Sequence, residues 1–341
     1  MVRPTSAVTT QPLAAHADWS VDPRKRWVAL ARPDAGRWKL EPPVPVGAVG
    51  TFLDRLRQEA EGRPMALGAD FPVGLPRSYA AALPDTDFPA FLRRVSPALP
   101  DFFQVAATLD EVAPGRPFYP ARGARGMSRA GLAGALGLSG ADALNRACDR
   151  ATVERPAGAP LFWTVGANQT GKAATAAWRD MLCPALARGG GVALWPFAGP
   201  FRALLAPGVV ALAETYPAES ARHLGIRLAG SKRRQADRAG VAASLHAAMR
   251  DLNAAPAPEL AAAVWDGFGA AADGEDRFDC VVGVLGVLNV LAGNRPDTAP
   301  ADPWIQQWEG WVLGQTALPR PVSAVALPAE SRSALASLSA K

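Results

Sequence analysis

Short apolar runs separated by turns fill the first 75 residues, and this alternation constrains the fold more than any other feature of the chain. Residues 13–19, 27–32 and 37–40 predict three consecutive strands joined by charged or glycine-containing turns. Apolar residues three and four apart then predict an amphipathic helix over residues 46–60. An apolar strand over residues 65–70 follows and ends at an aspartate before Phe-Pro. Three strands, a helix and a buried strand predict an α/β fold.

The last third of the chain continues this pattern. Strand signals return at residues 191–196 and 208–217. Helical patterns follow at residues 231–253 and 274–293, the second of which is apolar on all sides after its first turn. We therefore expect these segments to extend one mixed sheet and to cover it with helices.

A long segment interrupts that core. Residues 76–190 are rich in proline and carry only short helical patterns, which predicts a mostly helical insertion or lid. The core itself is then discontinuous, with residues 12–75 and 191–315 in one unit. Residues 1–11 and the tail 316–341 are expected to be flexible.

Composition excludes several classes of protein. Hydrophobic residues at 49% and charged residues at 20% match a packed globular chain. The longest apolar stretch, residues 280–293, is shorter than the ~20 residues that cross a bilayer, and the start of the chain lacks the apolar core of a signal peptide. Three scattered cysteines and three histidines offer neither a disulfide framework nor a zinc site. We expect a cytoplasmic protein without a membrane or disulfide-linked partner, while its oligomeric state stays open.

Arginine dominates the positive charge. Five of the 36 Lys and Arg residues are Lys, so 31 are Arg, and the net charge is +5. Guanidinium groups bind phosphate bidentately, although the codon usage of a GC-rich genome would give the same excess. Arg116 and Arg122 lie in a loop that has no acid between residues 112 and 140, which favours contact with substrate phosphates. The cluster at residues 232–238 fits a solvated helix face slightly better.

Four acidic residues occur where burial would make a charge costly. Asp18 lies at the first strand, Asp70 and Glu214 end apolar strands, and Asp279 opens the apolar helix. Asp276 precedes Asp279 by three residues and shares its helix face. A buried carboxylate must be paired, protonated or bound to a metal, and hard oxygen ligands suit Mg²⁺ or Mn²⁺. Two such ions could activate a water for phosphodiester hydrolysis.

Each acid also has a purely structural explanation. Asp70 could cap a turn, and Asp276 could stabilise the positive end of a helix dipole. Glu214 could pair with an arginine of residues 231–238. Any one acid is explained in this way, but the four together favour a site.

The order of these acids along the strands and the last helix resembles that of the ribonuclease H-like fold. Four short strings also resemble domain of unknown function family 429, whose members are described as RNase H-like nucleases. The strings are ADFPVGLP at 69–76, AETYPAES at 213–220, DGEDRFDCVVG at 273–283 and EGW at 309–311. The resemblance spans residues 15–311 and is weakest over 77–190.

This resemblance implies a ribonuclease H-like core with a metal-binding carboxylate site. The implied catalytic acids are Asp18, Asp70, Glu214 and Asp279, with Asp276 as a further metal ligand. Mg²⁺ or Mn²⁺ would be the cofactor.

Residues 166–173, GANQTGKA, nearly match the phosphate loop GxxxxGK[ST]. Ala173 replaces the residue whose hydroxyl would bind Mg²⁺, which argues against an NTPase. Lys172 and the backbone near Gly171 could still contact a substrate phosphate.

The sequence therefore predicts a metal-dependent nuclease or phosphodiesterase that acts on nucleic acid or a nucleotide-like phosphoester. Arg116, Arg122 and Lys172 would bind its phosphates. A nucleotide-binding or phosphotransfer protein that uses residues 166–172 is one alternative. A non-catalytic binding or scaffold protein with structural acids is the other.

Overall fold

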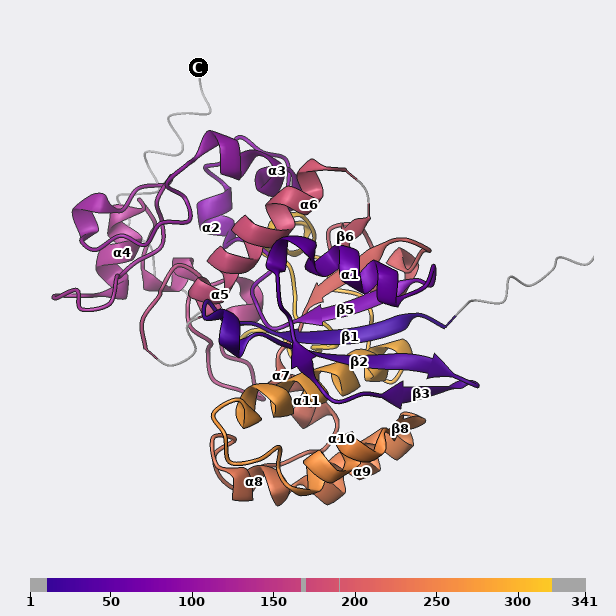
Figure 1. The fold of residues 1–341 in the computed structure, drawn as a ribbon. Coiled ribbons are helices and arrows are strands. Elements are labelled where there is room, and N and C mark those ends of the chain that lie inside the picture. The colour runs from indigo at the N-terminus through magenta and orange to yellow at the C-terminus, as the bar shows by residue number, and fades with distance from the viewer. Residues whose placement is uncertain (1–10, 167–169, 190, 321–341) are drawn as a thin grey trace, which may run out of the picture.

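A mixed sheet of eight strands forms the centre of the structure, a computed structural model that describes residues 11–166, 170–189 and 191–320 (Figure 1). The strands are β1 (Leu13–Asp18), β2 (Trp27–Asp34), β3 (Arg37–Leu40), β4 (Val44–Pro45), β5 (Met65–Ala69), β6 (Val192–Leu194), β7 (Val210–Glu214) and β8 (Ala254–Pro256). Their order is β6-β7-β5-β1-β2-β3-β8, and β4 pairs with β2. The expected α/β class is confirmed.

Strand direction places several carboxyl ends at one edge of the sheet. β1, β2 and β3 form the expected antiparallel meander, whereas β5, β7 and β6 continue from β1 in parallel. β1, β5 and β7 therefore end at the same edge, where ligands of open α/β sheets usually bind. The short edge strand β8 has no alternating pattern, and the sequence did not predict it.

Alternating residues of the strands pack against two different helical layers. Leu13, Ala15 and Ala17 of β1 belong to one hydrophobic cluster with α1 (Phe52–Glu59). Ala14 belongs to a second cluster on the opposite face, with α7 (Pro217–His223), α9 (Ala242–Asp251), α10 (Pro258–Trp265) and α11 (Gly274–Leu291). Figure 1 shows α1 above the sheet and α9 to α11 below it. The helix predicted over residues 231–253 is broken at Gly240 into α8 (Gln235–Ala239) and α9.

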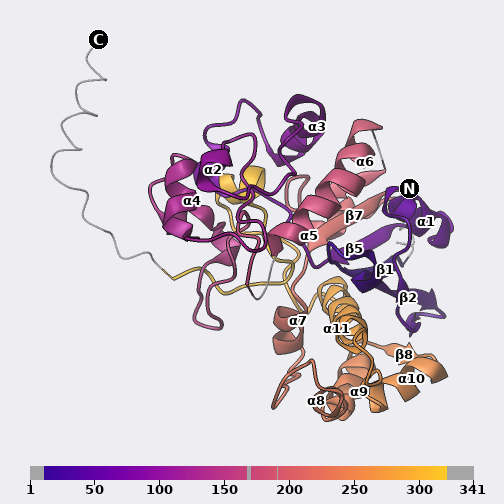
Figure 2. The same cartoon turned by 60° about the vertical axis from the view of Figure 1, so that its left-hand side comes forward.

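The segment 76–190, which the sequence predicts to be mostly helical, contains short helices joined by long loops. Its helices are α2 (Arg77–Ala80), α3 (Phe88–Ala98), α4 (Arg129–Ala135), α5 (Thr170–Ala177) and α6 (Cys183–Ala187). Phe88, Phe118 and Trp178 of this segment share one hydrophobic cluster with α1 and β5, so the insertion extends the core on the α1 side of the sheet. Figure 2 shows α5 and α6 next to the sheet, and α2 and α4 farther from it.

Three further expectations concern membrane spans, disulfides and the ends of the chain. None of the helices within the described residues is long and apolar enough to cross a membrane. Cys148, Cys183 and Cys280 are all free and buried. The predicted flexible ends, apart from residues 11 and 316–320, lie outside the described residues. Within the described part of the tail, the Arg320 N–H donates to the Ala151 carbonyl oxygen at 2.8 Å.

Candidate functional site

Asp18 and Asp70 lie side by side where β1 and β5 end. Ala17 pairs with Ala69 in the parallel register, and the Asp70 N–H donates to the Ala17 carbonyl oxygen at 3.0 Å. Side chains alternate along a strand, so Asp18 shares a sheet face with His16, two residues earlier. That face is the one covered by α11.

Helix α11 brings Asp279 to the same point. A Cβ atom on Gly283 would lie 2.3 Å from the His16 ring, so glycine at this position lets the helix lie directly on β1. Asp279 precedes Gly283 by one turn, a distance of about 6 Å along the helix. Asp18 follows His16 by two residues, about 6.7 Å along the strand. Asp279 therefore lies close enough to Asp18 for the two carboxylates to repel each other, and Asp276 acts on Asp18 in the same way.

Burial and repulsion by neighbouring acids raise the pKa of all four aspartates, and at Asp279 the repelling acid is Glu275. Burial is the largest cause in each, and the charge of Asp279 adds to the rise at Asp18, Asp70 and Asp276. The pKa of Asp70 rises to about 7 and that of Asp276 to about 6. One oxygen of Asp276, Oδ2, is buried and has no hydrogen-bond partner among the described residues. Carboxylates in this state are stabilised by a cation.

Lys232 supplies such a cation. Its ammonium group donates a short hydrogen bond to Asp279 Oδ2 and lies 3.4 Å from Glu275 Oε1. It also interacts electrostatically with Asp70. The basic cluster at residues 232–238 is therefore not only a solvated helix face.

Glu214 lies on the other side of the sheet. It shares the face of Val210 and Leu212, which pack in the α1 cluster. Both of its oxygens are 2.6 Å from the guanidinium group of Arg146, and the Val73 N–H donates to Oε2 at 2.7 Å. The structure thus does not place Glu214 in the group formed by the aspartates. Its partner also comes from the insertion and not from residues 231–238.

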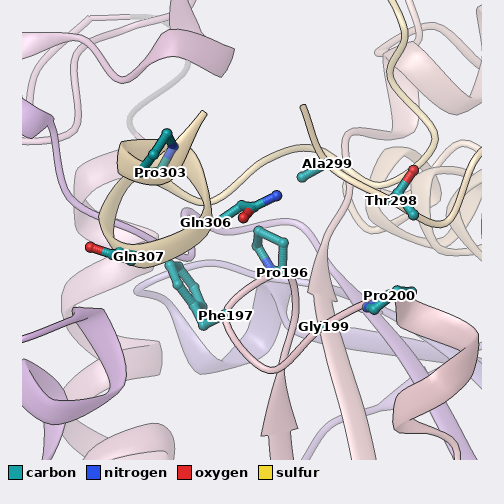
Figure 3. A pocket seen from close by; sticks show the side chains of 9 residues that line it. All are labelled: Pro196, Phe197, Gly199, Pro200, Thr298, Ala299, Pro303, Gln306 and Gln307. Atoms are coloured by element: carbon teal, nitrogen blue, oxygen red, sulfur yellow. The ribbon is translucent and has the colours of Figure 1, made fainter. Parts of the chain in front are cut away.

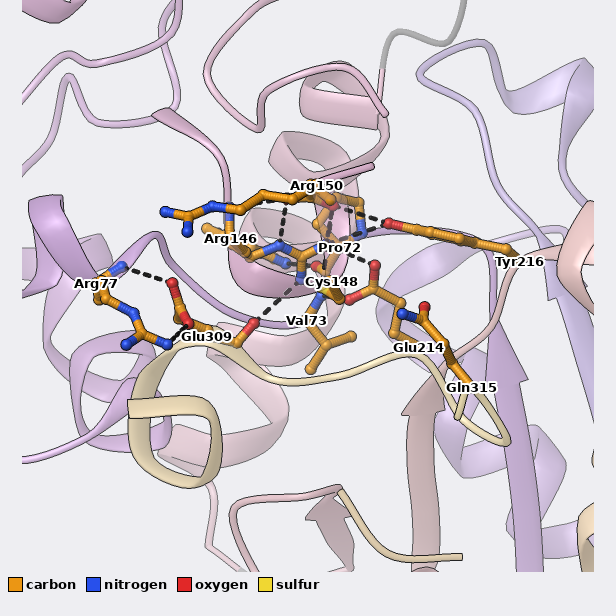
Figure 4. A network of polar contacts seen from close by, with 12 residues as sticks. Pro72, Val73, Arg77, Arg146, Cys148, Arg150, Glu214, Tyr216, Glu309 and Gln315 are labelled. Carbon is orange, nitrogen blue, oxygen red and sulfur yellow. Dashed lines mark hydrogen bonds and ion pairs between the residues drawn. The ribbon is translucent and has the colours of Figure 1, made fainter. Parts of the chain in front are cut away.

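Arg146 is the centre of a buried polar network that joins the insertion to the core (Figure 4). Its guanidinium group also donates to both oxygens of Asp149, at 2.9 Å each, and the Tyr216 hydroxyl donates to Asp149 at 3.0 Å. Beside it, Glu309 accepts from the Arg77 guanidinium at 2.6 Å. The EGW string therefore has a structural role here.

A pocket of about 440 Å³ opens next to Asp70. Core and insertion both line it, and its polar and aromatic lining residues are Trp19, Asp70, Asp149, Arg155, Thr170, Tyr216, Arg222 and Lys232. Arg155 lies 5.8 Å from the Tyr216 ring centroid, and Arg155 and Arg222 both approach the single carboxylate of Glu219. Three cations, Arg155, Arg222 and Lys232, thus line the same pocket as Asp70, which suits an anionic ligand.

A second pocket, of about 540 Å³, has no comparable chemistry (Figure 3). Prolines, Phe197 and two glutamine side chains line it, and none of the predicted acids reaches it. We therefore take the smaller pocket as the candidate site.

The predicted phosphate-binding cations are not in that pocket. Arg116 pairs with Glu111 at 3.1 Å, an acid just outside the acid-free stretch. Arg122 is exposed, and neither it nor Lys172 lines the pocket, although Thr170 and Ala173 do. Sequence reasoning missed Arg155 and Arg222, whose only signal was their charge.

The GANQTGKA motif also lacks the context of a phosphate loop. A phosphate loop follows a strand, but residues 161–165, which precede the motif, contain a single bridge between Trp163 and Tyr119. Residues 167–169 of the motif lie outside the described residues. A Cβ atom on Gly171 would lie 2.1 Å from the Leu161 carbonyl oxygen, so this glycine is required by packing.

The aspartates have the hard oxygen donors that Mg²⁺ or Mn²⁺ prefers. Among the described residues, however, the groups whose ligand atoms all lie within 4.8 Å of one another are Cys148–Asp149–Glu214 and Glu154–Glu219–His223. The first of these is already neutralised by Arg146. The aspartates fit a divalent ion in chemistry and charge, but their side chains would have to move closer together to bind it.

Comparison of the chain with protein-family models, with curated proteins and with solved structures finds no match. The candidate site therefore rests on its own geometry and electrostatics.

Proposed function

We propose that the chain is a divalent-metal-dependent phosphodiesterase with a ribonuclease H-like core, acting on nucleic acid or a nucleotide-like phosphoester. One observation carries this proposal: Asp18 and Asp70 end two adjacent strands, Asp279 of α11 is close enough to raise the pKa of both, and Arg155, Arg222 and Lys232 line the pocket beside Asp70. The order of these acids along the chain supports the ribonuclease H-like assignment, as does the meander followed by parallel strands.

The residues of the site divide into two groups by charge. Asp18, Asp70, Asp276 and Asp279 would hold Mg²⁺ or Mn²⁺, which would supply an activated water and neutralise developing negative charge. Arg155 and Arg222 would bind the phosphate on the pocket side, since guanidinium donors match its oxygens.

The remaining residues of the pocket would position the substrate. Tyr216 offers an aromatic surface next to Arg155, which suits a nucleoside or base. Glu214 has a supporting role in this proposal, because it fixes Arg146 and thereby the wall of the pocket that carries Asp149.

Hydrolysis assays with matched variants test the proposal. Purified protein is incubated with single-stranded oligonucleotides and with bis(p-nitrophenyl) phosphate, with Mn²⁺ or with EDTA. We expect Mn²⁺-dependent hydrolysis that falls on the order of 100-fold or more in Asp70→Asn and Asp279→Asn. Asp251→Asn, the same change at an exposed residue of α9, should retain the activity. Absence of Mn²⁺-stimulated hydrolysis, or full activity of Asp70→Asn, would refute the proposal.

A further inference from the structure

The Lys232 side chain is partly exposed, yet its ammonium group lies against the carboxylates of Asp279 and Glu275. Its side chain is 44% exposed, whereas that of Asp279 is only 6% exposed. The ammonium group nevertheless contacts Asp279 Oδ2 and approaches Glu275, and the charge of Asp70 acts on it as well. A lysine on the surface thus reaches inward to the point where the carboxylates gather.

The backbone of this lysine is held in place while its side chain is not enclosed. The Lys232 carbonyl oxygen accepts a hydrogen bond from Arg238 Nη1 at 2.5 Å, and the Ser231 N–H donates to Asp237 at 2.8 Å. The first turn of α8 therefore anchors the loop. The four-carbon stem of a lysine can change rotamers without any movement of this anchor.

The ammonium group and a metal ion would compete for the same oxygen. Asp279 Oδ2 accepts the hydrogen bond of Lys232, and two cations repel each other strongly at contact distance in a partly buried site. No three of the four aspartates have carboxylate oxygens that all lie within 4.8 Å of one another. Removal of the lysine tip would free the oxygen and allow the side chains to close.

Lys232 also lines the pocket that contains Arg155 and Arg222. Its side chain can therefore leave Asp279 and remain beside the cationic wall, where a substrate phosphate would neutralise it. This gives the ammonium group a second position within reach of the same backbone anchor.

We infer that Lys232 is a built-in counter-ion of the carboxylate group, and that a divalent ion binds there by displacing its ammonium group from Asp279 toward the pocket. Lys232 is thus a positioning residue that couples metal binding to the phosphate-binding wall. This inference rests on the proposed function, because it takes the aspartates as the metal ligands.

Calorimetric titration with Mn²⁺ at pH 8 measures the competition. Lys232→Met should bind Mn²⁺ about tenfold more tightly or better, because one positive charge has left an acidic site. Lys232→Arg keeps the charge and should bind no more tightly than the wild type. Arg233→Met, which removes a neighbouring side chain that is 80% exposed, is the matched control and should change affinity little. Equal or weaker binding by Lys232→Met would overturn the inference.

Amine labelling of the unaltered protein gives an independent test that needs no variant to fold. Mass spectrometry follows the rate of reductive methylation at Lys232 and at the exposed Lys39 of β3 as Mn²⁺ is added. We expect labelling of Lys232 to rise at least severalfold and that of Lys39 to stay constant. Unchanged labelling of Lys232 at saturating Mn²⁺ would overturn the inference.

The two proposals fail in different ways. Hydrolysis that depends on Asp70, together with unchanged Mn²⁺ affinity in Lys232→Met, overturns the displacement and leaves the enzyme proposal intact. Tighter binding by Lys232→Met without any hydrolysis supports the displacement and overturns the enzyme proposal.

Discussion

Asp70 and Glu214 stand at neighbouring strand ends, yet their surroundings have opposite charge. Ala69 pairs with Glu214, so Asp70 lies only one residue beyond that pair. Asp70 lies among other carboxylates, and its pKa rises to about 7 mainly through burial and through Asp279. Glu214 is held by Arg146 on the other face. Neutralising each residue should therefore change stability in opposite directions.

For Asp70, the charged form is the unfavourable one in the folded protein. Its pKa is about 7 when folded and near 3.8 when unfolded, so the folded state loses stability as the pH rises from about 4 to 7. Asp70→Asn removes this loss and should raise the melting temperature by about 2–4 °C at pH 8 without metal. The gain should vanish near pH 4. Thermal melting of Asp70→Asn and the wild type between pH 4 and pH 8 measures this gain, with Asp251→Asn as control. A lower melting temperature of Asp70→Asn than of the wild type at pH 8 would contradict the prediction.

For Glu214, the negative charge stabilises the folded protein, because it pairs with the buried guanidinium group of Arg146. Glu214→Gln weakens the bonds to Arg146 and leaves a buried guanidinium incompletely paired, which should cost about 3 kcal/mol. Urea unfolding at pH 8 measures this loss. A Glu214→Gln protein that is as stable as the wild type, or more stable, would show that Glu214 belongs to the repelling acids after all.

At the scale of elements, the site depends on how closely α11 lies on the sheet. Gly283 has no side chain where the His16 ring packs, and a Cβ atom on Gly68 of β5 would lie 2.7 Å from Val287 of the same helix. These two contacts fix the distance between the helix and both aspartate-bearing strands. A change in that distance should move Asp279 away from Asp18.

Gly283→Ala tests this dependence. The added methyl group meets a buried ring and should cost about 1–3 kcal/mol, even though alanine ordinarily favours a helix. Mn²⁺ affinity should fall with stability. Gly134→Ala in α4 is the matched control, because a Cβ atom there meets nothing within 4 Å, and it should be neutral or stabilising. Urea unfolding measures the stability of both variants, and Mn²⁺ titration measures their metal affinity. Equal stability and equal Mn²⁺ affinity of the two variants would contradict the close packing of α11.

Elements with a strong local pattern were predictable from the sequence. The apolar runs of β1, β5 and β7 and the long apolar helix α11 fold as their composition dictates. Asp18, Asp70 and Asp279 could be found because a strand or helix end fixes their position. The face to which Glu214 points depends on its pairing register with β5, which local patterns do not specify.

Partners that lie far apart in the sequence were not predictable either, because local patterns do not specify them. Arg146 reaches Glu214 across 68 positions, and Lys232 reaches Asp279 across 47. Nothing in the local sequence of either cation distinguishes it from the other arginines and lysines of the chain. The break at Gly240 was missed because apolar spacing continues on both sides of it.

At the scale of the whole molecule, the candidate site lies at one sheet edge and is lined by residues of both the core and the insertion. The aspartates lie between the sheet and α11, with Lys232 paired to Asp279, whereas Arg155 comes from the insertion and, like Arg222, pairs with Glu219. The insertion shares a hydrophobic cluster with the sheet and is also tied to it by Arg146 and Arg77. The pocket therefore exists only when both parts are packed together.

A crystal structure of the protein soaked in Mn²⁺, with anomalous scattering to locate the ion, tests directly whether the aspartates bind a metal. We expect Mn²⁺ density bound by Asp18, Asp70 and Asp279, with the Lys232 ammonium group moved away from Asp279. Glu214 should remain paired with Arg146. Density beside Cys148, Asp149 and Glu214, or no density near the aspartates at saturating Mn²⁺, would contradict it.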